Sequence, residues 1–210
     1  ANFAHSTTIT YLPNDGTGDT NKKVVTVGSN TDTNFKANLL DTNPFSVPGW
    51  TFGGWHTVSN GVGGEPKQLG AEIDAEANMP QTWYAQWYRV NADDSITVPG
   101  EDGNPKNEAT NATAKGNGTD APTRNDKGEI EVPKGGSVTL PDGSVIGMPD
   151  GGKLLPNGTV IINRPEDKGT ITIPGTNGKP DVKDENGDPV PDANAEVFTL
   201  TYTINNGEHD

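Results

Sequence analysis

The stretch Pro48-Gly49-Trp50-Thr51-Phe52-Gly53-Gly54-Trp55 decides the fold of the N-terminal part, and Trp83-Tyr84-Ala85-Gln86-Trp87 completes it. All four tryptophans of the chain lie in these two segments. Both contain β-branched or aromatic residues and are bounded by Gly or Pro, a pattern that predicts β-strands. Because only 30% of the residues are hydrophobic, these rings must form most of the N-terminal core. A fully buried ring contributes about 1.5–3 kcal/mol.

Within the second segment, Trp83, Ala85 and Trp87 share one face of the predicted strand. We expect a structural core made of these residues: Tyr11, Phe35, Leu39, Trp50, Phe52, Trp55, Trp83 and Trp87. Exposed tryptophans can instead stack on sugar rings. An open, coplanar set of them would therefore indicate a glycan-binding surface.

The composition favours a mainly β protein with a thin core and excludes several partners. The 27 glycines and 17 prolines leave no long uninterrupted window for a helix. The net charge of −14 repels nucleic acid and anionic lipid, and no apolar run is long enough for membrane insertion. The absence of cysteine excludes disulfides and thiol catalysis, and it fits an extracellular protein of the Gram-positive surface type. No signal peptide is visible, so we expect an excised piece of a larger protein.

Two further strands and one short helix are expected in the N-terminal part. Residues 7–12 and 23–27 have the composition and alternation of strands and are separated by turn residues. Residues 31–40 are the one helix-like window, because Phe35 and Leu39 follow a helical spacing.

The order strand, Pro-Asn-Asp-Gly turn, strand, Pro-Gly-Trp-Thr-Phe-Gly-Gly-Trp and finally Trp-Tyr-Ala-Gln-Trp resembles the Listeria–Bacteroides repeat, also called the internalin B-repeat family. The resemblance covers residues 7–88 and implies a β-grasp-like module of a bacterial cell-surface protein. Trp50 stands where the family usually has tyrosine, and His56 where asparagine is common. Because the family consists mainly of stalk or adhesion modules, the resemblance implies no catalytic residues and no cofactor.

The predicted domain organisation has four parts. Residues 1–90 form the β-grasp-like module, and residues 91–127, rich in Asn, Gly, Thr, Asp and Pro, form an extended loop or linker. Residues 128–195 form an all-β domain of short strands. Residues 196–210 are either the first strand of a following repeat or a closing edge strand.

Turn sequences between short apolar segments predict an all-β meander in the C-terminal domain. Three of them have the form apolar-Pro-Asp/Asn-Gly: Leu140-Pro141-Asp142-Gly143, Met148-Pro149-Asp150-Gly151 and Leu155-Pro156-Asn157-Gly158. Proline presets φ for the first turn position and glycine accepts a positive φ, which favours tight reversals. A β-solenoid, in which similar sequences bend the chain without reversing it, is the alternative.

Two internal similarities indicate repeated units. Residues 95–105 recur as residues 170–180, and residues 8–16 recur as residues 199–207. Self-similarity of this kind is typical of an array. We expect one unit of a repetitive stalk followed by the opening of the next, with neighbouring modules of the same chain as partners.

Candidates for chemistry are few. Three histidines lie far apart in the sequence and predict no metal site: His5, His56 and His209. Three alternating residues resemble the first ligands of a calcium loop and form a weak candidate site: Asp184, Asn186 and Asp188. Pro189 stands where such a loop needs glycine. No Gly-x-Ser-x-Gly motif is present, so nucleophilic catalysis is not expected.

The sequence therefore predicts a non-enzymatic stalk or adhesion segment of a secreted, wall-associated bacterial surface protein. Short β-modules in series would project a distal element from the cell, and Gly/Pro-rich connections would set the stiffness. Two alternatives stay open. One is a module that binds a host protein or a glycan, and the other is an accessory domain of a secreted hydrolase, which a cleft with two facing carboxylates would support.

Overall fold

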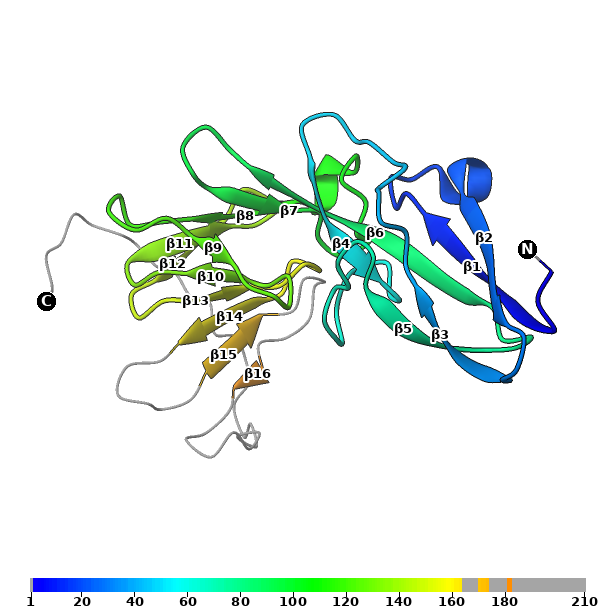
Figure 1. Ribbon diagram of the computed structural model, residues 1–210. Helices are drawn as coiled ribbons and strands as arrows, with labels where there is room; N and C mark the ends of the chain where they lie inside the picture. The colour runs from blue at the N-terminus through cyan, green and yellow to red at the C-terminus, as the bar shows by residue number, and fades with distance from the viewer. Residues whose placement is uncertain (1, 164–169, 174–180, 183–210) are drawn as a thin grey trace, which may run out of the picture.

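The computed structural model describes residues 2–163, 170–173 and 181–182, and these residues form a mainly β protein (Figure 1). Its strands are β1 (His5–Leu12), β2 (Lys23–Ser29), β3 (Asn34–Asn38), β4 (Thr51–His56), β5 (Glu72–Glu76), β6 (Gln81–Val90), β7 (Ile96–Val98), β8 (Ala112–Lys115), β9 (Thr123–Arg124), β10 (Ile130–Val132), β11 (Gly136–Thr139), β12 (Val145–Met148), β13 (Gly152–Leu154), β14 (Val160–Asn163), β15 (Thr170–Ile173) and β16 (Asp181–Val182). Two short 3-10 helices accompany them: η1 (Gly18–Asn21) and η2 (Glu108–Thr110).

The N-terminal module, which comprises β1 to β6, is organised around β6. Strand β1 pairs antiparallel with β2 and parallel with β6, and β4 pairs antiparallel with β6. Strands β3 and β5 form a separate two-stranded antiparallel sheet. The core of this module contains the residues predicted from the sequence. Five of them are buried, namely Tyr11, Leu39, Trp55, Trp83 and Trp87, and three are partly buried against them, namely Phe35, Trp50 and Phe52.

The glycine pair in the deciding stretch forms a β-bulge. The register between β4 and β6 shifts between Phe52 and Trp55, so that Trp55 faces Ala85. Residues three apart in a regular strand point to opposite faces, but an extra residue brings both onto one face. Phe52 and Trp55 are therefore both part of the core, with ring centroids 4.9 Å apart. Gly54 has φ +113°, a value that only glycine adopts without strain.

The structure contradicts the helix predicted over residues 31–40. This segment contains β3, which pairs with β5 over its whole length. Phe35, Ala37 and Leu39 are directed at the core, and the residues between them are exposed. The two apolar residues that suggested a helical period also fit a period of two, and pairing with β5 favours the strand.

The structure also contradicts the linker predicted over residues 91–127. This segment contains β7, η2, β8 and β9. Ile96 and Val98 of β7 and Ala112 and Ala114 of β8 are buried. The two inward-facing residues of β8 are alanines, so the hydrophobic signal of this strand is too weak to stand out from a polar loop.

Two sheets pack face to face in the C-terminal module, which comprises β7 to β16 (Figure 1). One consists of β7, β8, β11 and β12 and continues the N-terminal sheet through β6, and the other has the order β16-β15-β14-β13-β10-β9. Aliphatic side chains from both sheets form one core: Ile96, Val98, Ala112, Ala114, Ile130, Val132, Val138, Ile146, Met148, Leu154, Val160 and Ile162. Strands β13 to β16 pair antiparallel in succession. The meander prediction is therefore confirmed for β13 to β16, whereas the chain crosses between the two sheets from β10 to β11 and from β12 to β13. All strand pairs of this module are antiparallel, so the solenoid alternative is wrong for the described strands.

Two of the three predicted reversals, at residues 140–143 and 155–158, share one hydrogen-bonding pattern. The third, at residues 148–151, is not a hairpin, because it connects β12 to β13, which belong to different sheets. The Leu140 N–H donates to the Ser144 carbonyl over 2.8 Å, and the Gly143 N–H donates to the Leu140 carbonyl over 2.9 Å. The side chain of Asp142 accepts from the Ser144 N–H over 2.9 Å. Residues 155–159 repeat these bonds with asparagine in place of aspartate. The result is a tight hairpin with glycine at positive φ, which fixes the register of the strands on either side.

Candidate functional site

The four tryptophans do not form an open platform. The side chains of Trp55, Trp83 and Trp87 are 0%, 6% and 6% exposed. Trp50 is partly buried, and the guanidinium carbon of Arg89 lies 5.0 Å from its ring centroid. The indoles are therefore used for packing and cation–π contact, and no coplanar exposed set offers a surface to a sugar.

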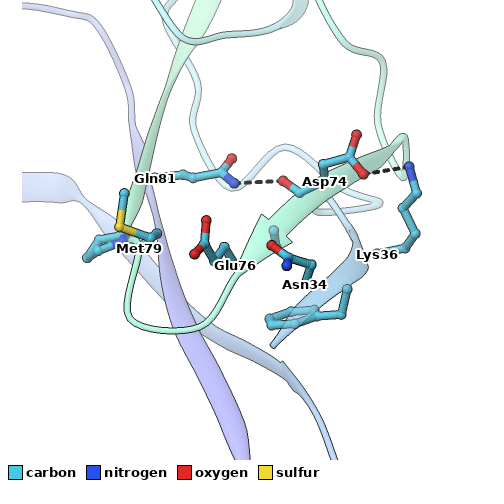
Figure 2. A pocket seen from close by; sticks show the side chains of 9 residues that line it. Asn34, Lys36, Asp74, Glu76, Met79 and Gln81 are labelled. Carbon is cyan, nitrogen blue, oxygen red and sulfur yellow. Dashed lines mark hydrogen bonds and ion pairs between the residues drawn. The ribbon is translucent and has the colours of Figure 1, made fainter. Parts of the chain in front are cut away.

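A groove of about 600 Å³ lies where β3, β5 and the turn between β5 and β6 meet (Figure 2). It is lined by Asn34, Phe35, Lys36, Asp74, Ala75, Glu76, Met79, Pro80 and Gln81. The Gln81 side chain donates from Nε2 to the Asp74 carbonyl over 2.8 Å. Met79 is 58% exposed, the largest exposure of any large hydrophobic side chain described. The groove thus combines hydrogen-bonding groups with an accessible thioether.

The charges beside this groove are mostly negative. Strand β5 presents Glu72, Asp74 and Glu76 on its exposed face. Lys36 Nζ lies 2.7 Å from Asp74 Oδ1 and 4.0 Å from Glu72 Oε1. The hydrogen bond to Asp74 and the charge of both carboxylates raise the pKa of Lys36, so it stays a cation.

A second pocket, of about 390 Å³, lies between the two modules. Its walls are residues 61–65 of the N-terminal module and Lys127, Glu129, Leu155 and Pro156 of the C-terminal module. Two acidic residues, Glu65 and Glu129, therefore line one pocket, and they are the residues on which the hydrolase alternative would have to rest.

Glu129 is held as an anion. Its Oε2 lies 2.9 Å from Lys153 Nζ and accepts from Asn125 Nδ2 over 2.9 Å. Partial burial raises the pKa of Glu129, but the hydrogen bonds from Lys153 and Asn125 outweigh it and leave the pKa below its ordinary value. A general acid for glycoside hydrolysis needs a raised pKa. This carboxylate is thus suited to an ion pair and not to proton donation.

Arg124 connects the modules at the bulge of β4. Its guanidinium carbon lies 4.9 Å from the ring centroid of Tyr88, and its Nη2 donates to the Gly53 carbonyl over 2.9 Å. A Cβ at Gly53 would lie 2.8 Å from that nitrogen, so glycine makes room for the arginine. Burial lowers the pKa of Arg124, a cost that the acceptor and the aromatic face offset. The bulge therefore both shapes the aromatic core and receives a side chain from the other module.

A second connection joins the first turn of the chain to the segment before β8. Lys106 Nζ lies 2.7 Å from Asp15 Oδ2, and the Asp15 side chain is only 8% exposed. Burial raises the pKa of Asp15, but hydrogen bonds from Lys106 and Thr17 outweigh it and lower the pKa overall. A Cβ at Gly16 would lie 2.6 Å from the amide nitrogen of Asn104. The turn and the segment thus fit closely against each other.

The residues considered for metal binding do not come together. Within the described residues, no group of three or more His, Cys, Asp or Glu side chains is placed to hold a metal ion. His56 is buried, and its Nδ1 accepts from the Val58 N–H over 2.9 Å. Burial lowers the pKa of His56, which keeps the ring neutral. His5 lies on β1. Four candidates lie outside the described residues: Asp184, Asn186, Asp188 and His209.

The junction residues are the functional feature that sequence reasoning missed. Arg124 and Gly53 are 71 positions apart, and Lys106 and Asp15 are 91 apart. Neither pair has a local pattern to reveal it. The one available signal was a single arginine in an otherwise polar, glycine-rich stretch.

No family model, curated protein or solved structure matches the chain. None of the described helices has both the length and the apolar character needed to cross a membrane. The resemblance to the Listeria–Bacteroides repeat therefore rests on the aromatic motifs around β4 and β6.

Proposed function

We propose that the chain is a non-enzymatic stalk segment, with a role in spacing and adhesion, of a secreted, wall-associated bacterial surface protein. The observation that carries this proposal is the coupling of two modules with separate cores. Strand β6 pairs with β1 and β4 in one module and with β7 in the other, so one sheet runs through both (Figure 1). Modules in one chain usually move relative to each other unless their interface is extensive. A shared strand opposes such motion and suits a spacer.

The two side-chain connections strengthen this argument. Arg124 binds the bulge carbonyl of β4, and Lys106 pairs with the buried Asp15. The bonds start from different elements of the C-terminal module, and they end on different elements of the N-terminal module. Both bonds therefore oppose motion of one module relative to the other at β6.

The topology of the N-terminal module supports assignment to the Listeria–Bacteroides repeat family. Its first strand, β1, runs parallel to its last strand, β6, in a mixed sheet, as expected for a β-grasp-like module. Strand β3, paired with β5, lies in the segment where we expected the helix. On this proposal the chain is extracellular, and its partners include neighbouring modules.

Labelling of intact cells tests the location. An antibody raised against the chain should label the encoding bacterium without permeabilisation, and brief protease treatment of intact cells should remove the signal. An antibody to a cytoplasmic protein is the control. Labelling that requires lysis would rule the proposal out.

One observation favours a second candidate, a module that binds a host protein or a glycan. The groove beside β3 and β5 exposes Met79 and several polar groups to a partner (Figure 2). Glycan and matrix-protein arrays probed with the purified chain test this candidate. A hit that Met79→Ala abolishes, and that Lys22→Ala at a distant exposed ion pair leaves intact, would favour binding over spacing. A segment that acts only as a spacer would give no such hit.

A further inference from the structure

The first strand and the last strand of the N-terminal module run side by side in the same direction. The register pairs Ile9 with Gln81, Thr10 with Thr82, Tyr11 with Trp83 and Leu12 with Tyr84. The chain enters β1 at its His5 end and leaves β6 at its Val90 end. Because the strands are parallel, these two points lie at opposite ends of the pair.

This geometry determines how the module responds to tension. When the start of β1 and the end of β6 are pulled apart, the strands must slide along each other, and the hydrogen bonds between them carry the load together. In an antiparallel hairpin the free ends lie at the same edge, so tension opens the bonds one after another. Simultaneous loading gives a higher barrier to forced unfolding than sequential opening.

We propose that the β1–β6 pair is a shear clamp, a load-bearing element that resists tension along the chain. This function goes beyond spacing, and it follows from the strand directions wherever the protein is located. The same sheet also contains a pair that should open easily under tension. Strand β1 forms an antiparallel hairpin with β2, in which His5 faces Ser29.

Side chains extend the clamp beyond the paired backbone. Asn14, just after β1, donates from Nδ2 to the Ala85 carbonyl of β6 over 3.1 Å. The indole N–H of Trp87 donates to the Pro13 carbonyl over 2.8 Å, and this bond is buried. Both bonds tie the chain that follows β1 to the next part of β6. Sliding of the two strands would break them along with the ladder.

Single-molecule pulling in two directions tests the clamp. The chain contains no cysteine, so two introduced cysteines define where force is applied to the full chain. Asn2→Cys with Val90→Cys loads β1 against β6 in shear, and Val90 is 54% exposed. Asn2→Cys with Asp32→Cys is the matched control, because it pulls open the β1–β2 hairpin.

At equal loading rates, the shear pair should unfold at a force at least about two-fold higher than the hairpin pair, because forced unfolding follows the unfolding barrier. Equal forces, or a lower force for the shear pair, would overturn the proposal. Asn14→Gly adds a second readout. Glycine keeps the positive φ of 55° found at this position while removing the amide. It should lower the shear force and leave the hairpin force unchanged, whereas equal reductions in both would contradict a clamp role for Asn14.

Discussion

The two modules build their cores from different kinds of side chain. The N-terminal core uses a few large rings, with Tyr11 and Phe52 each 4.9 Å from Trp55 between centroids. The buried part of the C-terminal core is entirely aliphatic and is spread over both sheets. A sequence with 30% hydrophobic residues can therefore close a core either with bulky rings or with many small side chains held in register by tight turns.

Among substitutions that test this difference, removal of the Trp55 ring should have the largest effect on stability. Trp55→Ala should cost the N-terminal module about 3–5 kcal/mol and unfold it at lower denaturant concentration, while the C-terminal module remains folded. All four tryptophans lie in the N-terminal module, so indole fluorescence follows that module alone and circular dichroism follows both. Loss of both modules in one transition would show that the cores are not independent.

The corresponding substitution in the aliphatic core should have the next largest effect on stability. Leu154 is fully buried, and Leu154→Ala should cost about 2–5 kcal/mol. The circular dichroism transition of the C-terminal module should move to lower denaturant while the fluorescence transition stays in place. A shift in the fluorescence transition of similar size would argue against separate cores.

Loss of the Arg124 contact between the modules should have a smaller effect on stability. Arg124→Ala leaves the Gly53 carbonyl without its donor and should cost about 1–3 kcal/mol. It should also move the fluorescence and circular dichroism transitions further apart than in the natural chain, because the modules lose a shared contact. Arg124→Lys is the control, since lysine keeps the charge but not the planar group over Tyr88. Transitions that are no further apart in Arg124→Ala than in the natural chain would mean that Arg124 does not couple the modules.

The Asp15–Lys106 pair should make coupling depend on pH. The pKa of Asp15 is lower in the folded chain than its ordinary value, so its contribution is complete above that value. It disappears as the pH falls through the folded pKa. Lys106 is half exposed, which limits the effect to about 1 kcal/mol. Unfolding of Lys106→Met and of the natural chain should differ at neutral pH and converge in acid. A constant difference would contradict a role for the ion pair.

Loss of the ion pair beside the groove of β3 and β5 should have the smallest effect on stability. Lys36→Ala removes an exposed ion pair and should leave both unfolding transitions unchanged within error. Thermal melts followed by fluorescence and circular dichroism check this. A clear shift would mean that the β3–β5 sheet depends on this pair and is not held mainly by its inward-facing residues.

Aromatic and turn residues carried most of what the sequence could reveal. The tryptophan segments predicted β4, β6 and the core they fill, and the apolar-Pro-Asp/Asn-Gly turns predicted the C-terminal meander. The helix was wrongly predicted because Phe35 and Leu39 satisfy two periods, and only the partner strand β5 distinguishes them. Strand β8 was missed because its two inward-facing residues are alanines.

The junction lay beyond sequence reasoning for a different reason. Whether Arg124 stays in solvent or enters another module depends on the position of Gly53 in space, and that position is set by a register shift within β4. The groove has the same origin, because Met79 and Lys36 come from separate elements. Contacts of this kind follow from the assembled fold.

The hydrogen bonds of the glycine-containing turns also affect the chemical ageing of the chain. An Asn or Asp followed by glycine ages when the glycine amide nitrogen attacks the side-chain carbonyl and closes a succinimide ring. In the turns at Asp142-Gly143, Asp150-Gly151 and Asn157-Gly158, that nitrogen is already engaged as a donor to the carbonyl of Leu140, Met148 and Leu155, respectively. The bond holds the nitrogen away from the attack geometry. These turns, two of which also set the register of paired strands, therefore slow deamidation and isoaspartate formation at the sequences most prone to them.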